Sequence, residues 1–162
     1  MIFLLMMTNF PDIPEEKNQK KVTKITNCDT AVPVSISELN RITKIIENEE
    51  KVQFHHIELV YVKEEDIVEV NKEYLNRDYV TDIITFRYDE DESNSSIEGT
   101  LFCCAPRISE QSVEFNVDQK EEYLRIFIHG LLHLLGYKDE SEEEKSIMTG
   151  LENKYLDKFK SA

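Results

Sequence analysis

The sequence predicts an α+β fold, in which a small mixed sheet of about four strands packs against several helices. Four short segments alternate apolar with polar residues or are rich in β-branched residues, as strands are. Other segments repeat apolar residues at helical spacing. The chain has 162 residues, enough to bury a core without disulfides. We expect an irregular N-terminal segment over residues 1–21 and a single domain over residues 22–162.

The acidic character of the chain limits its partners. The sequence holds 33 Asp and Glu against 19 Lys and Arg, a formal net charge of −14. Broad binding to nucleic acid needs clustered basic side chains, so this charge disfavours it. Much of the acid lies in two short runs, 89–92 and 139–144. A local basic patch is therefore still compatible with the composition.

The cysteines and the apolar N-terminal residues indicate the cellular compartment of the protein. Three cysteines, two of them adjacent at Cys103 and Cys104, do not form a disulfide framework, which favours a reducing cytoplasm. The opening MIFLLMM is far shorter than the roughly 20 residues needed to cross a bilayer. It also lacks the flanks of a signal peptide. We expect a cytoplasmic protein that makes no contact with a membrane.

The first half of the chain predicts two strand and helix pairs. Residues 22–26 form a short strand, and Ser35 with Glu38 forms a capping box that opens a helix. A second strand covers residues 56–62 and precedes a second helix. The apolar stripes expected to face the core are Ile36, Leu39, Ile42, Ile45 and Ile46 in the first helix, and Ile67, Val70, Tyr74 and Leu75 in the second.

The second half predicts a hairpin followed by three helices. Strands near 82–88 and 99–104 pair around an acidic loop, and Cys103 and Cys104 point to opposite faces as buried apolar residues. A helix runs from Pro106 toward residue 117. Asp118 caps a largely apolar helix that continues to residue 135, and a last helix opens at residue 141 and ends near residue 159.

Two histidines lie four residues apart in the apolar helix. His129 and His133 therefore project from one face, one turn apart, as a metal chelate would. Gly136 can adopt the left-handed conformation that ends a helix, which brings Asp139 within reach as a third ligand. Gly130 weakens the helix interior, a loss best explained if another backbone or a substrate comes close. The alternative is a pair of buried histidines with ordinary hydrogen bonds.

The spacing H-x-x-x-H-x-x-G-x-x-D has the layout of the zinc peptidase motif H-E-x-x-H-x-x-G-x-x-H. It predicts a zincin-like metal helix that binds one Zn²⁺ ion. Gly130 replaces the glutamate that acts as general base in those peptidases. Asp139 replaces the third histidine, and a carboxylate can also bind zinc. Three protein ligands leave the fourth zinc position for water, while the protein groups that act in catalysis stay unassigned.

Other polar residues give weaker signals. His55 and His56 are adjacent in a strand, so one is expected to be exposed and one packed. Asp82 lies where a loop becomes a strand and is typical of a turn or cap. Remaining candidates are Arg107 and Arg125, which can hold phosphate but are more often solvated, and Cys28, which we expect to be inert.

Two motifs resemble the YbeY family of bacterial metal-dependent endoribonucleases. The stretch HGLLHLLGYKD is similar to the family's H-G-x-L-H-L-x-G-Y-D-H, and VNKEYLNRDYVTDIITF is similar to its upstream Asn, Thr-Asp and strand block. The likeness covers about residues 35 to 157 and implies His129, His133 and Asp139 as zinc ligands. Glu140 and Glu142 are the nearest substitutes for Asp139.

The chain departs from the family pattern at two further positions. The family's arginine is replaced by Leu75, which leaves Arg77 as the residue implied for phosphate binding. The family's Gly-Asp pair in the strand after the acidic loop is present as Gly99 and Thr100.

The resemblance also implies a function. It predicts a zinc-dependent, single-strand-specific endoribonuclease of small-subunit ribosomal RNA maturation and ribosome quality control. Its partners would be single-stranded RNA, in particular ribosomal RNA, and the ribosome or ribosomal proteins. Two alternatives stay open: a zinc peptidase that lacks the usual glutamate base, and a noncatalytic metal-binding module associated with the ribosome.

Overall fold

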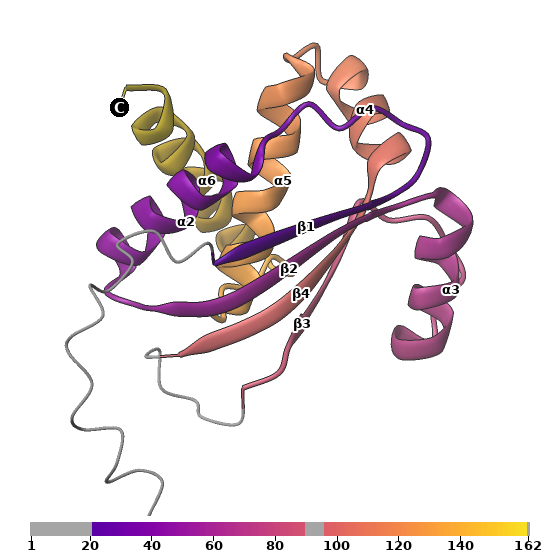
Figure 1. The fold of residues 1–162 in the computed structure, drawn as a ribbon, viewed down its shortest axis with the longest axis horizontal. Coiled ribbons are helices and arrows are strands. Elements are labelled where there is room, and N and C mark those ends of the chain that lie inside the picture. Colours follow the sequence, from indigo (N-terminus) through magenta and orange to yellow (C-terminus); the bar gives the residue numbers. More distant parts are fainter. Residues whose placement is uncertain (1–20, 90–95, 162) are drawn as a thin grey trace, which may run out of the picture.

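The computed structural model describes residues 21–89 and 96–161, which form an α+β fold (Figure 1). The predictions made for residues 1–20 and for most of the acidic loop lie outside the described residues. The elements in chain order are β1 (Val22–Asn27), α2 (Ile36–Glu50), β2 (Phe54–Val62), α3 (Glu64–Leu75), β3 (Ile83–Arg87), β4 (Ile97–Cys104), α4 (Ala105–Glu114), α5 (Gln119–Leu134) and α6 (Glu142–Ser161).

The four strands form one mixed sheet in the order β1-β2-β4-β3. The pairs β1–β2 and β2–β4 are parallel, whereas β3 and β4 form the predicted antiparallel hairpin. Because β4 inserts between β2 and β3, the strand β3 lies at the edge of the sheet. This edge strand contacts α5, the helix that carries the histidine pair.

Helices α2, α5 and α6 cover one face of the sheet, and α3 packs against the other (Figure 1). The larger core lies between the sheet and the three helices, and α5 supplies its central apolar residues. Cys103 belongs to this core and Cys104 to the smaller core under α3, so the two thiols point to opposite faces as predicted. No helix in the described part of the chain is long and apolar enough to cross a bilayer.

Several details differ from the sequence predictions. His55 and His56 are both exposed, because the register of β2 against β4 shifts between Phe54 and His56 and breaks the alternation of faces. Ile36, Tyr74 and Leu75, which the sequence predicts to face the core, are 37%, 60% and 43% exposed, because they lie at the ends of α2 and α3. The ring of Tyr74 makes an edge-type contact with Phe86. The helix predicted from Pro106 to residue 117 ends at residue 114.

Candidate metal centre

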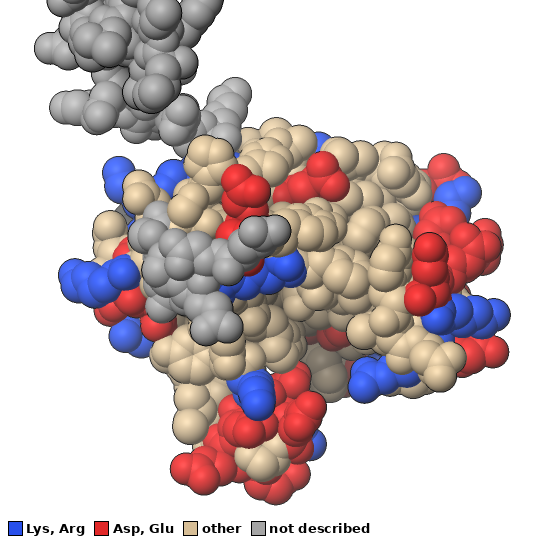
Figure 2. Space-filling model, turned by 90° about the horizontal axis from the view of Figure 1, so that it is seen from below, with Lys and Arg blue, Asp and Glu red and all other residues tan. Residues whose placement is uncertain are grey.

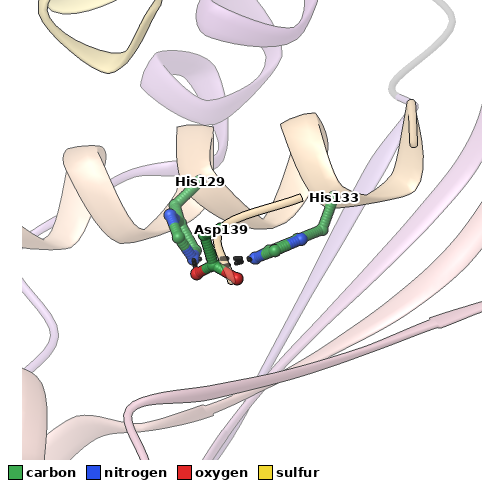
Figure 3. Close-up of side chains that lie close together, drawn as sticks. All are labelled: His129, His133 and Asp139. Carbon is green, nitrogen blue, oxygen red and sulfur yellow. Dashed lines mark hydrogen bonds and ion pairs between the residues drawn. The ribbon is translucent and has the colours of Figure 1, made fainter. Parts of the chain in front are cut away.

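The structure brings His129, His133 and Asp139 together (Figure 3). The two imidazoles project from one side of α5, and the carboxylate returns from the loop after the helix. The Nε2 atoms of the two histidines are 2.9 Å apart. The Asp139 Oδ2 atom lies 3.4 Å from Nε2 of His129 and 3.5 Å from Nε2 of His133. Three potential ligand atoms therefore converge on one point.

The end of α5 turns the chain back toward the histidines. Gly136 adopts a φ of 98°, the left-handed conformation expected from the sequence. Its N–H donates to the His133 carbonyl, and the N–H of Tyr137 donates to the Leu132 carbonyl. This pair of hydrogen bonds is the Schellman arrangement that closes a helix. It places Asp139 over the last turn of α5.

Each imidazole is also held through its other nitrogen. The Nδ1 of His129 lies 3.2 Å from Oε2 of Glu152 on α6, and the Nδ1 of His133 lies 3.0 Å from the carbonyl oxygen of Tyr137. Both partners are acceptors, so each Nδ1 carries the hydrogen and each Nε2 presents its lone pair. Two lone pairs and a carboxylate oxygen then face one another, an arrangement that needs a proton or a metal cation between them.

The electrostatics around His129 favour positive charge. Burial disfavours the charged imidazole, but the Glu152 hydrogen bond and the negative charges of Glu152, Asp82 and Asp139 outweigh it, so the pKa of His129 is raised. The same negative field would favour a bound cation. In a tetrahedral zinc site the ligand atoms are about 3.3–3.6 Å apart. The two Asp139 distances match this spacing, whereas the Nε2–Nε2 distance of 2.9 Å is shorter, so the two imidazoles would move slightly apart to hold a metal ion.

Gly130 packs against the sheet. A Cβ atom at this position would lie 2.7 Å from Cδ1 of Ile83 and 3.0 Å from Cδ1 of Leu101. The sequence predicts that a backbone or a substrate comes close to Gly130, but the atoms that come close are side-chain methyl groups on strands β3 and β4. A side chain such as the glutamate that peptidases carry at this position would require Ile83 and Leu101 to move.

The arginine candidates occupy different surroundings. Arg77 is exposed in the loop between α3 and β3 and makes no hydrogen bond or ion pair with the three clustered residues. Arg107 pairs with Glu110 and Glu114 on its own helix, and these contacts raise the pKa of its guanidinium. Arg125 forms an ion pair with Glu152 at 3.5 Å, and Glu152 is the carboxylate that contacts His129.

The remaining candidates have structural partners or lie apart. Asp82 accepts a hydrogen bond from Gln111 through its carboxylate and one from the Cys104 N–H through its carbonyl, as a residue at a strand end does. Glu140 and Glu142 are exposed and do not join the cluster. Cys28 is partly buried, and burial raises the pKa of its thiol, which agrees with an inert residue.

Sequence reasoning missed Glu152 and the Tyr137 carbonyl, the two groups that orient the imidazoles. A signal for Glu152 was present, since this acid falls within the buried stripe of α6 and is only 8% exposed. A buried carboxylate in an apolar stripe indicates a specific partner. A main-chain carbonyl gives no such signal.

Comparison with known proteins extends the likeness seen in the motifs. The profile of a family described as Endoribonuclease YbeY matches residues 15–160. The chain belongs to the YbeY family. Proteins called endoribonuclease YbeY from Bacteroides fragilis and Ureaplasma urealyticum serovar 10 are 42% identical over 100 residues and 38% identical over 99 residues. These matches cover 62% and 61% of this chain, and 70% and 64% of the relatives.

One further relative and one solved structure extend the comparison. The YbeY protein of Chlorobaculum parvum is 35% identical over 119 residues, which cover 74% of this chain and 82% of that protein. The solution structure of TM1509 from Thermotoga maritima aligns with a TM-score of 0.55 at 24% identity, over 85% of this chain and 88% of the other. That structure supports the fold of this YbeY-family chain.

Proposed function

We propose that this chain is a zinc-dependent endoribonuclease that cleaves single-stranded RNA, with one ion bound by His129, His133 and Asp139. The observation that carries the proposal is the convergence of two imidazole Nε2 lone pairs and a carboxylate oxygen, with both Nδ1 atoms engaged elsewhere. The family supplies the reaction class, because its members are named endoribonucleases. A zinc ion in this position would act as a Lewis acid for a phosphodiester oxygen.

The protein groups have distinct tasks in this proposal. Glu152 and the Tyr137 carbonyl keep the Nδ1 atoms protonated and the rings fixed. Asp139 completes the ligand set as the variant of the family's third histidine. Arg77 is the candidate for binding a substrate phosphate, since it is exposed and its guanidinium has no ion pair among the described residues.

The surface can accept RNA despite the net charge of −14. On the face shown in Figure 2, acidic side chains gather at one side and on one projection, with smaller groups nearer the middle, and a broad zone between them is uncharged. Tyr74 and Tyr79 flank Arg77 in the sequence and are 60% and 53% exposed. Exposed aromatic rings stack on unpaired bases, which favours single-stranded over double-stranded RNA.

The cellular role we propose is the maturation of small-subunit ribosomal RNA and ribosome quality control in the cytoplasm. Ribosomal RNA would be the substrate, and the ribosome or its proteins the partners. The family membership supports this role.

The test measures zinc content and cleavage of RNA in parallel. Wild-type protein should hold about one zinc per chain and cut an unstructured RNA oligonucleotide faster than its duplex. His133→Ala should lose both zinc and cleavage, whereas His55→Ala, a matched change at an exposed histidine, should keep both. Full cleavage by metal-free His133→Ala would overturn the proposal. If Asp139→Ala keeps its normal zinc content, then Asp139 is not the third ligand, and the rest of the proposal stands.

Cleavage of a peptide library by the same protein should be measured with and without a chelator. Zinc-dependent peptide cleavage without RNA cleavage would replace the proposal with a peptidase. Zinc binding with neither activity would leave a noncatalytic module. We expect no peptide cleavage, because Gly130 occupies the position at which peptidases carry the glutamate base.

A further inference from the structure

The carboxylate of Glu50, the last residue of α2, receives two tyrosine hydroxyls. The Tyr137 hydroxyl donates to Oε2 at 2.8 Å, and the Tyr155 hydroxyl donates to Oε1. Burial and the Glu50 charge raise the pKa of Tyr137, so its hydroxyl keeps its proton and donates. One side chain thereby joins α2, the loop after α5 and helix α6, which lie side by side (Figure 1).

The position of Glu50 is electrostatically unfavourable. An acid at the C-terminal end of a helix opposes the helix dipole, and the last turn of α2 has no basic residue to compensate. The neighbouring acids have cations, since Glu47 pairs with Lys21 and Glu49 pairs with Lys154 and Lys158. Glu50 has none within ion-pair distance among residues 21–89 and 96–161. The two tyrosine hydroxyls are therefore the groups that stabilise the negative charge of Glu50 in this position.

Tyr137 links Glu50 to the metal centre. The side chain of this tyrosine ends on Glu50, while its carbonyl oxygen lies 3.0 Å from Nδ1 of His133. Its N–H completes the turn that starts the loop to Asp139. The backbone of Tyr137 thus sets both the ring orientation of His133 and the path of the carboxylate ligand.

We infer that Glu50 is a positioning residue of the metal centre. It acts through Tyr137, by fixing the loop whose carbonyl orients His133 and whose next residues bring in Asp139. This inference rests on the proposed metal site, though not on the RNA substrate. Groups that orient a metal-binding histidine typically change metal affinity 10- to 100-fold when they are removed.

The experiment compares four single changes by zinc affinity, measured in competition with a chromophoric chelator, and by the absorption spectrum of the Co²⁺-loaded protein. Tyr137→Phe removes the link to Glu50 and keeps the carbonyl. Glu50→Ala removes the acceptor of both hydroxyls. We expect each to weaken zinc binding about tenfold and to alter the Co²⁺ bands.

Two control changes separate positioning from general stability. Tyr155→Phe breaks the other half of the Glu50 interaction, and Glu49→Ala removes the adjacent carboxylate; both should bind zinc within twofold of wild type. Wild-type zinc affinity and Co²⁺ spectrum in Tyr137→Phe would overturn the inference, as would equal weakening by Tyr155→Phe. If the wild type binds no zinc, the proposed function and this inference both fail. If it binds zinc but does not cut RNA, only the endoribonuclease assignment fails.

Discussion

Oε2 of Glu152 lies 3.2 Å from Nδ1 of His129, across the interface between α6 and α5. The other oxygen of the same carboxylate lies 3.5 Å from the Arg125 guanidinium. Glu152 is only 8% exposed, so it is fixed between a cation and the imidazole it orients. The carboxylate defines which nitrogen of His129 faces Asp139.

Replacing Glu152 by glutamine should weaken zinc binding about 10- to 100-fold, because the negative partner of the His129 Nδ1–H is lost. Zinc affinity from chelator competition gives the measurement. Glu143→Gln, an exposed change on the same helix, serves as the control and should leave the affinity unchanged. Equal affinities for the two variants would show that Glu152 does not support the metal centre.

The histidine pair was predictable because its geometry is local. Four residues along a helix place His129 and His133 on one face whatever the rest of the chain does. Asp139 was predictable because a helix-ending glycine precedes it closely. Glu152 lies 13 residues beyond Asp139, and its contact with His129 depends on how α6 packs against α5. Sequence periodicity places Glu152 in the apolar stripe of α6, but it does not show which residue of α5 this acid meets.

In the fold too, features set by neighbouring residues were predictable, and features set by distant residues were not. The β3–β4 hairpin follows from two neighbouring strand patterns, and it is confirmed. The insertion of β4 between β2 and β3 depends on parallel pairing across a long crossover, which alternation does not encode. The prediction for His55 and His56 was wrong because it assumed unbroken alternation through a strand whose register shifts.

Removing the metal should leave the protein folded. The main core contains apolar residues from the sheet and from α2, α5 and α6, and none of its contacts needs an ion. Circular dichroism in excess chelator should therefore keep its helical signal. Free zinc at about 100 times its dissociation constant should add about 2.7 kcal/mol of stability, seen as a higher melting temperature. The absence of that shift in His133→Ala is the control, and cooperative unfolding on chelation would make the site structural.

Two helical glycines should respond to alanine with opposite signs. A Cβ atom added at Gly150 on α6 would have no neighbour within 4 Å, so Gly150→Ala should stabilise the protein by about 0.5–1 kcal/mol. In Gly130→Ala, contact with Ile83 and Leu101 should outweigh that gain and give a net loss of about 1–2 kcal/mol. Urea unfolding measures both variants. A stabilised Gly130→Ala would contradict the tight packing of α5 on the sheet.

Glu122 on α5 is buried, and burial is the main cause of the raised pKa of its carboxyl. The charges that face it are Arg125, which lowers the pKa, and Asp82, Glu152 and Glu121, which raise it. An acid with a raised pKa in the folded state binds its proton more tightly when folded. Stability is therefore lost as the pH rises from the unfolded-state pKa through the folded-state pKa, and the loss is complete above it.

Glu122→Gln removes this titration and should raise the free energy of unfolding at pH 7. The gain should shrink as the pH falls through the raised pKa and vanish below the ordinary glutamate range, because both states then hold the proton. Urea unfolding of the two proteins at a series of pH values measures the difference. Glu73→Gln, an exposed change on α3, should show no such pH dependence. A gain that is constant with pH would mean that Glu122 does not titrate differently in the folded state.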